Sequence, residues 1–223
     1  MSPIKAVIFD LDGTLVNSTP SHIMAWLEAS KVMGLTGISR SQVKELMGRT
    51  SYDIAKELLQ ITGKPISLMY ELARIKDELF IEKYTNQIKA IKGANEVLRE
   101  LKQMGLKICV VSSNPRKLII KVLKATKLEK HIDSIVGQNE VNQGKPSPEP
   151  ILLALKRLSV KHTEAVVVGD SEYDIIAARK AGVRSIGVCS DPFKKNKMLK
   201  NGAFIVVNEL SEVLKVIKEL QAK

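Results

Sequence analysis

Short apolar runs alternate with helix-like segments from Gly93 to the end of the chain, and this alternation limits the possible folds more than any other feature of the sequence. Strands joined by helices indicate a parallel sheet with helices on both faces, because parallel strands are connected by right-handed crossovers. We expect strands at residues 107–111, 134–136, 165–168, 185–188 and 204–207, and helices before Gly105, from about Pro115, from about Pro148, and at residues 174–181 and 209–220.

The first apolar run, Ile4 to Phe9, fits another strand of the same sheet, and the turn after it reads Asp10-Leu11-Asp12-Gly13-Thr14. The stretch beyond this turn contains no convincing strand but several helical segments that begin at capping residues. Ligands of such sheets bind beyond the carboxyl ends of the strands, so an insertion at this point would cover the binding site as a lid. We expect an α/β core at residues 1–15 and 88–223 and an inserted helical domain at residues 16–87.

Two capping signals and one apolar stripe support this helical insertion. Ser39 with Gln42 resembles a capping box, and Ser51 is expected to cap the next helical segment. A later segment has its apolar residues at helical spacing, as expected for one buried face. These residues are Leu68, Leu72, Ile75 and Leu79.

Composition excludes several classes of protein. Hydrophobic residues make up 44% of the chain and no run approaches a membrane-spanning helix, so we expect a cytoplasmic protein with no membrane partner. We expect it to be a monomer or a homodimer. The formal net charge of +11 suits an anionic partner. Because the basic residues are scattered and aromatic residues are only 4%, a phosphorylated metabolite fits better than a nucleic acid. Cys109 and Cys189 lie in or beside apolar runs, and neither is expected to be catalytic.

Asp10 and Asp12 stand two residues apart at the carboxyl end of the first expected strand, so their side chains would share one face. One carboxylate would then attack as a nucleophile while the other transfers a proton. A carboxylate that attacks phosphorus forms an acyl phosphate, which an activated water must hydrolyse. These residues taken alone also fit a plain turn, but the apolar strand before them favours the catalytic interpretation.

Two further motifs follow the later apolar strands. Val110-Val111-Ser112-Ser113-Asn114 places a hydroxyl and exposed backbone amides before a helix, where a phosphate is well accommodated, although such a turn also serves as a helix cap. Gly144-Lys145-Pro146 holds a lysine rigidly, which suits an ammonium that neutralises a phosphate and nearby carboxylates. Without the neighbouring motifs, Lys145 would be interpreted as an exposed lysine in a turn.

The run Gly169-Asp170-Ser171-Glu172-Tyr173-Asp174 ends an apolar strand with one acid and places a second acid in the first turn of a helix. Magnesium prefers one or two protein carboxylates together with waters and phosphate oxygens, and Asp170 with Asp10 would supply the carboxylates. Asp170 and Asp174 also suit the positive end of the helix as capping residues. Capping and metal binding are compatible at such a helix end.

In order and spacing, the motifs at Asp10, Ser112, Lys145 and Asp170 resemble the four sequence motifs of the haloacid dehalogenase-like (HAD) hydrolase superfamily, over nearly the whole chain. The resemblance implies an α/β fold with a Rossmann-like, doubly wound parallel sheet under an inserted helical cap of the C1 type. Because Asp12 is present, the dehalogenases of the family, which lack this second acid, are a poor match.

The resemblance also implies a role for each motif residue. Asp10 would be the nucleophile, and Asp12 would protonate the leaving group and then activate water. Magnesium would be coordinated by Asp10, Asp170 and the backbone carbonyl of Asp12, while Asp174 would orient water bound to the metal. The residues expected to hold the phosphate are Thr14, Ser112, Ser113 and Lys145.

Within the superfamily, the forms of the motifs resemble those of phosphatases similar to phosphoglycolate phosphatase. Their first motif commonly continues with Asp-Ser, where this chain has Asn17-Ser18. β-Phosphoglucomutases usually carry other residues at Thr14 and Gly169, and phosphonoacetaldehyde hydrolases use a cap lysine that composition does not exclude. A non-enzymatic aspartate phosphoacceptor of the receiver type would have no need of Asp12 or of a large cap. An RNA-binding α/β protein is the remaining alternative, prompted only by the net charge.

Two residues of the expected cap are candidates for contact with the substrate. Arg49, in Gly48-Arg49-Thr50, would meet a second anionic group such as a carboxylate, and His22 would point into the cleft. The alternatives carry equal weight: Arg49 on a solvated face, and His22 packed on Trp26.

Overall fold

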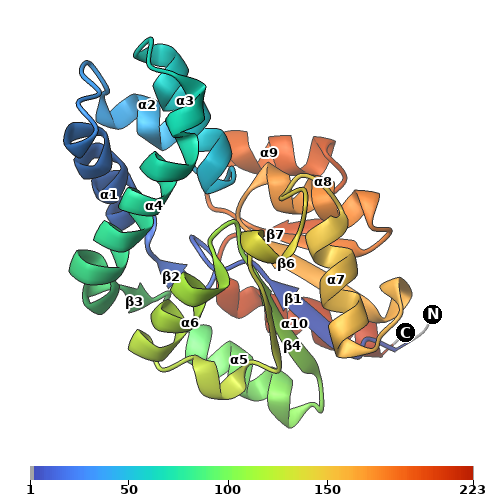
Figure 1. Ribbon diagram of the computed structural model, residues 1–223. Coiled ribbons are helices and arrows are strands. Elements are labelled where there is room, and N and C mark those ends of the chain that lie inside the picture. Colours follow the sequence, from blue (N-terminus) through green and yellow to red (C-terminus); the bar gives the residue numbers. More distant parts are fainter. Residues whose placement is uncertain (1–2, 223) are drawn as a thin grey trace.

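The computed structural model describes residues 3–222, and it confirms the parallel sheet that the sequence predicts (Figure 1). In these residues the main sheet has 6 strands in the order β5-β4-β1-β6-β7-β8, and every neighbouring pair is parallel. The central position of β1 puts the turn after it between the ends of β4 and β6. The strands are β1 (Ala6–Phe9), β4 (Lys107–Val111), β5 (Ser134–Val136), β6 (Ala165–Gly169), β7 (Arg184–Val188) and β8 (Ile205–Val207).

Helices cover both faces of this sheet, because alternate residues of each strand point to opposite sides. In β1, Val7 and Phe9 pack into one apolar cluster while Ala6 and Ile8 pack into the other. The first cluster is completed by α5 (Ala94–Gln103), α6 (Arg116–Ala125) and α10 (Val213–Gln221), and the second by α7 (Glu149–Leu158) and α8 (Glu172–Lys180). The doubly wound arrangement predicted from the sequence is therefore confirmed.

A helical cap is inserted after β1 and has an apolar cluster of its own (Figure 1). Trp26, Leu58 and Leu72 lie at the centre of that cluster and are almost fully buried. Its helices are α1 (Thr19–Val32), α2 (Arg40–Glu45), α3 (Ser51–Ile61) and α4 (Met69–Leu79).

The helix starts in the cap agree with the sequence prediction at one position and differ at another. Ser39 and Gln42 form the predicted capping box of α2. The N-cap of α3 is Thr50, whose hydroxyl accepts the Asp53 N–H at 3.1 Å, so the prediction of Ser51 as the cap was wrong by one residue. Ser51 is instead the first residue of the helix.

Two short strands join the cap to the core, where the sequence showed no convincing strand. β2 (Val16–Asn17) and β3 (Lys89–Ala90) pair antiparallel, so the chain enters and leaves the cap side by side. Each strand is only 2 residues long, too short for an alternating pattern to reveal.

One helix was missed altogether. α9 (Pro192–Lys200) begins at Asp191, whose side chain accepts the backbone N–H groups of Phe193 and Lys194. Met198 is its one buried residue, so the segment lacks the apolar periodicity by which a helix is recognised. None of the helices in residues 3–222 combines the length and hydropathy that crossing a bilayer requires.

Candidate active site

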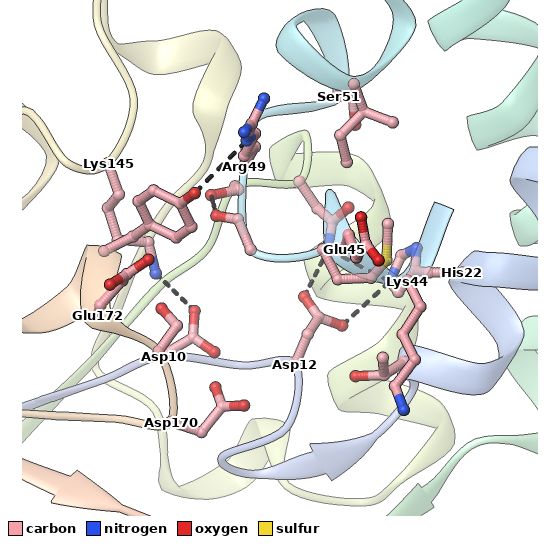
Figure 2. A pocket seen from close by; sticks show the side chains of 18 of the residues that line it. Asp10, Asp12, His22, Lys44, Glu45, Arg49, Ser51, Lys145, Asp170 and Glu172 are labelled. Carbon is pink, nitrogen blue, oxygen red and sulfur yellow. Dashed lines mark hydrogen bonds and ion pairs between the residues drawn. The ribbon is translucent and has the colours of Figure 1, made fainter. Parts of the chain in front are cut away.

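The sequence motifs meet at the carboxyl ends of three neighbouring strands. Asp10 follows β1, Ser112 follows β4 and Asp170 follows β6. Lys145 reaches Asp10 from the loop before α7 (Figure 2). Between these residues and the cap lies a cavity of about 630 Å³. A volume of this size is typical of sites for small molecules.

Lys145 holds two of the carboxylates together. Its Nζ donates to Asp10 Oδ1 and to Asp174 Oδ1, each at 2.6 Å, and all three residues are buried. Burial alone would lower the pKa of Lys145, but Asp10 and Asp174 raise it above its ordinary value, so the ammonium stays charged. Burial, together with Asp174 and Asp170, raises the pKa of Asp10 in spite of Lys145.

Asp12 is surrounded by hydrogen-bond donors. Ser18 Oγ and His22 Nε2 (3.1 Å) donate to Oδ1, while Ser112 Oγ (3.1 Å) and Asn114 Nδ2 (2.6 Å) donate to Oδ2. Burial would raise the pKa of Asp12, but His22 and the hydrogen bonds from His22 and Ser18 lower it to about 2. Asp12 is therefore an ionised proton acceptor at neutral pH, two residues along the chain from Asp10, whose pKa is raised.

A group of three acids has the composition of a metal site. Asp10, Asp170 and Asp174 each offer a carboxylate oxygen, and these oxygens lie within 4.8 Å of one another. Burial and the Asp174 carboxylate raise the pKa of Asp170 to about 7. The carboxylates of Asp10, Asp170 and Asp174 fit a hard divalent cation, which prefers carboxylate ligands and would balance their charge together with the ammonium of Lys145.

Two glycines make this acidic group possible. A Cβ atom added at Gly13 would overlap the carboxylate of Asp170, and one added at Gly169 would overlap that of Asp174. Gly13 also has a φ of 91°, a conformation that favours glycine. The backbone of the first and fourth motifs is therefore shaped to let the acids approach.

The structure places the residues predicted to bind phosphate at different depths. Ser113 and Lys145 line the cavity, whereas the Ser112 hydroxyl donates to Asp12. Thr14 is fully buried, and its hydroxyl donates to Asp170 Oδ1 at 3.4 Å. Phosphate binding by these residues stays a prediction, and for Thr14 the contact with Asp170 indicates support of the acidic group instead.

Both candidate residues of the cap line the cavity. The ring of His22 stacks on Phe80 at 3.9 Å between centroids. The Nε2 of His22 donates to Asp12 (Figure 2). Arg49 Nε donates to the Tyr173 hydroxyl at 3.4 Å, and its guanidinium lies 3.6 Å from Glu57. Burial and the nearby Lys76 lower the pKa of His22, while Asp12 acts in the opposite direction.

Among the residues of the cavity wall that the sequence analysis did not propose, Asn114 and Lys76 have the most distinctive contacts. Asn114 donates to Asp12, although the turn that contains it was noted only for its hydroxyl and backbone amides. Lys76 is 1% exposed, and its Nζ lies 3.0 Å from Asp77 Oδ1 and 5.4 Å from the ring centroids of Trp26 and Phe80. The available signal was its position four residues after Leu72, on the apolar face of its helix.

Comparisons with known proteins agree with this geometry. Residues 7–188 match the haloacid dehalogenase-like hydrolase family. A protein of Caldanaerobacter subterraneus named after the pyrophosphatase PpaX is 35% identical over 96% of this chain and 95% of its own. A phosphorylated carbohydrates phosphatase of Thermotoga maritima is 30% identical over 97% of this chain and 100% of its own. A phosphoglycolate phosphatase of Vibrio parahaemolyticus is 29% identical over 96% of each chain.

The fold is shared with solved structures as well. The crystal structure of a hydrolase from Pseudomonas syringae superposes with a TM-score of 0.84 at 29% identity, covering 96% of this chain and 98% of that one. The family match covers residues 7–188 of this chain, and the relatives align with nearly its full length. The chain therefore belongs to the haloacid dehalogenase-like hydrolase family.

Proposed function

We propose that this protein is a magnesium-dependent phosphatase that removes the phosphate from a small phosphorylated metabolite through a phosphoryl group carried on Asp10. The observation that supports the proposal best is the position of Asp10, at 2.6 Å from Lys145 Nζ and beside Asp170, with the proton acceptor Asp12 two residues away. The nucleophile Asp10, the ammonium of Lys145 and the proton acceptor Asp12 then face one cavity.

In the proposed first step, a carboxylate oxygen of Asp10 attacks phosphorus. As the new O–P bond forms, the bond from phosphorus to the leaving oxygen breaks, and Asp12 gives that oxygen a proton. Because Asp12 is ionised in the free site, it must first take up this proton, and the negative charge of an entering phosphate favours the uptake. Lys145 holds the attacking carboxylate in place.

In the second step, water attacks the phosphorus of the acyl phosphate. Asp12 accepts a proton from that water, and the bond between Asp10 and phosphorus breaks, which releases phosphate and restores the free carboxylate. The hydrogen bonds from His22 and Asn114 keep the Asp12 carboxylate oriented throughout. Magnesium held by Asp10 and Asp170, with Asp174 beside them, would balance the charge of the carboxylates and the phosphate.

For the substrate, we propose a phosphate monoester similar to phosphoglycolate, which carries a second anionic group. Arg49 is the residue that supports this choice, because its guanidinium lies on the cavity wall formed by the cap. The names of the relatives point to three kinds of substrate: a pyrophosphate, phosphoglycolate and phosphorylated carbohydrates. We further propose that the cap that selects among them comprises residues 16–87.

The proposal is tested by hydrolysis of para-nitrophenyl phosphate with magnesium. Wild type is expected to turn over, and both Asp10→Asn and removal of the metal with a chelator are expected to abolish turnover. Asp191→Asn is the matched control, because asparagine caps α9 as well as aspartate does and Asp191 lies outside the cavity wall. Equal rates for wild type and Asp10→Asn would refute the proposal. A screen of phosphoglycolate, sugar phosphates and pyrophosphate would then identify the substrate class.

A further inference from the structure

A short part of the cap, residues 48–51, touches the core at four places, and we name it the docking segment. Ser113 Oγ donates to the Gly48 carbonyl at 3.4 Å, and Arg49 Nε donates to the Tyr173 hydroxyl at 3.4 Å. The other two contacts join Thr50 to Gly144 and Ser51 to Gln138. Its partners lie in the segments that follow β4, β5 and β6, so the docking segment seats the cap over the same strand ends that carry the catalytic motifs.

The contact between Ser51 and Gln138 completes a helix of the cap with a side chain of the core. An α-helix leaves its first N–H groups without partners inside the helix. Thr50 satisfies the N–H of Asp53, whereas the N–H of Ser51 donates to Gln138 Oε1 at 2.9 Å. Ser51 is 3% exposed and Gln138 is 6% exposed, so water does not replace this acceptor while the cap is seated.

The side chain of Gln138 has no evident task within the core. Its loop is held by the backbone, because the Gln138 N–H donates to the Asn114 carbonyl at 3.0 Å. Its Nε2 is buried and has no hydrogen-bond partner among the residues that the structure describes. An apolar side chain would fill the same space without leaving a donor unpaired, so the acceptor that serves Ser51 is what distinguishes glutamine here.

The contact between Thr50 and Gly144 is equally specific. A Cβ atom added at Gly144 would overlap the methyl group of Thr50, and the next nearest atom, Thr50 Cβ, would be at an ordinary 3.8 Å. Gly144 does not have the positive φ that demands glycine, so room for Thr50 is the constraint. The residue before Lys145 is thus fitted to the seated cap.

We propose that Gln138 is a positioning residue of the phosphatase: it caps helix α3 from the core when the cap is seated, and with Gly144 it fixes the docking segment, and hence Arg49, over the cavity. This inference rests on the proposed function in one respect, that the cavity is where the reaction occurs. When the cap lifts, the N–H of Ser51 passes from Gln138 to water. Glutamine therefore acts through the cap and touches no reacting atom.

The capping contact is tested without any substrate, by amide hydrogen exchange of the wild type, Gln138→Leu and Gln138→Glu. In Gln138→Leu the Ser51 amide is expected to exchange about tenfold faster, as one hydrogen bond lost implies. Gln138→Glu keeps an oxygen acceptor at the helix start and is expected to retain the protection. The amide of Ile54, which donates to the Thr50 carbonyl, is the internal control. Unchanged exchange at Ser51 in Gln138→Leu would overturn the proposal.

The fit at Gly144 is tested by a compensating pair of substitutions. Gly144→Ala is expected to lower kcat/KM about tenfold, because the added methyl group keeps the cap from seating. The double variant Gly144→Ala with Thr50→Ser is expected to recover most of this loss. Serine at position 50 lacks the methyl group of threonine but keeps the capping hydroxyl. No recovery in the double variant would overturn the seating role. If the wild type itself shows no turnover, the proposed function fails, while the exchange experiment still decides whether Gln138 caps α3.

Discussion

The core wall and the cap wall of the cavity each contain a buried lysine, and the two lysines are held in different ways. Lys145 of the core is bound by two carboxylates at 2.6 Å. Lys76 of the cap has one carboxylate at 3.0 Å and otherwise lies near the rings of Trp26 and Phe80. The core wall thus holds its lysine in a network of compensating charges, whereas the cap wall holds its lysine beside aromatic rings.

This difference separates two tasks of the enzyme. On the proposed mechanism, a side chain in the charge network would be needed for the reaction of every substrate, and its loss would leave other buried charges uncompensated. A side chain of the cap wall would meet only the part of the substrate that the cap encloses. Substitutions on the two walls should therefore differ in stability, in metal requirement and in dependence on the substrate.

The largest effect is expected for Lys145→Met. Its loss leaves Asp10 and Asp174 without their shared cation, so unfolding free energy measured without metal should fall by about 3–5 kcal/mol. Activity should fall by about 10²–10³-fold for all substrates alike, as found when one donor to a developing charge is removed. Thermal denaturation and steady-state kinetics on two unrelated phosphates check both outcomes. A loss confined to one substrate would contradict the division between the walls.

Asp174→Asn tests the acidic group with a smaller change. The carboxylate accepts hydrogen bonds from the backbone N–H and the hydroxyl of Ser171, and asparagine keeps one acceptor for them. Its lost charge should weaken metal binding by about 10–100-fold, as for other groups that support a metal site. Titration of activity with magnesium should show the higher requirement, with near-normal rates at saturation. An unchanged requirement would remove Asp174 from the metal site.

On the cap wall, Arg49→Ala should discriminate between substrates. KM for a phosphate that carries a second anionic group should rise by about tenfold, the value of one charge-assisted hydrogen bond. KM for para-nitrophenyl phosphate, which lacks that group, should change little. Arg49→Lys serves as the control, because it keeps the charge but loses the forked geometry. If both substrates suffer equally, Arg49 does not select the second group.

The smallest effect on stability is expected for Lys76→Met, the direct counterpart of Lys145→Met. Methionine has a similar volume and contacts aromatic rings favourably, so unfolding free energy should stay within about 1.5 kcal/mol of wild type. Asp77, the carboxylate that loses its ion-pair partner, has a side chain that is 17% exposed. Denaturation of the two variants side by side gives the comparison. A destabilisation as large as that of Lys145→Met would show that the cap wall also depends on compensating charge.

The sequence predicted the core wall better than the cap wall for a physical reason. Parallel strands end at one edge of a sheet, so motifs at strand ends meet even when they are far apart in the chain, as Asp10 and Asp170 do. No such rule brings the helices of a cap together. Lys76 was missed because a lysine on an apolar face is normally solvated, and its burial depends on Trp26 of another helix as well as on Phe80 at the end of its own helix.

Other misses have local causes. α9 buries only Met198, and its charged residues hide the helical pattern. The capping of α3 was misplaced because Thr50 and Ser51 are both good capping residues, and the choice depends on Gln138, which is 87 residues away in sequence from Ser51. Contacts between distant segments decide such details, and sequence periodicity does not contain them.

The most direct test of the central claim is mass spectrometry of Asp12→Ala after reaction with para-nitrophenyl phosphate. The para-nitrophenolate leaving group needs no proton, so Asp10 of this variant should still be phosphorylated. Because the variant lacks the base Asp12, hydrolysis of the acyl phosphate should be slow. We predict a phosphoryl group on the peptide that contains Asp10, and its absence from Asp10→Asn. Continued turnover with no adduct on that peptide, or an adduct elsewhere, would contradict Asp10 as the nucleophile.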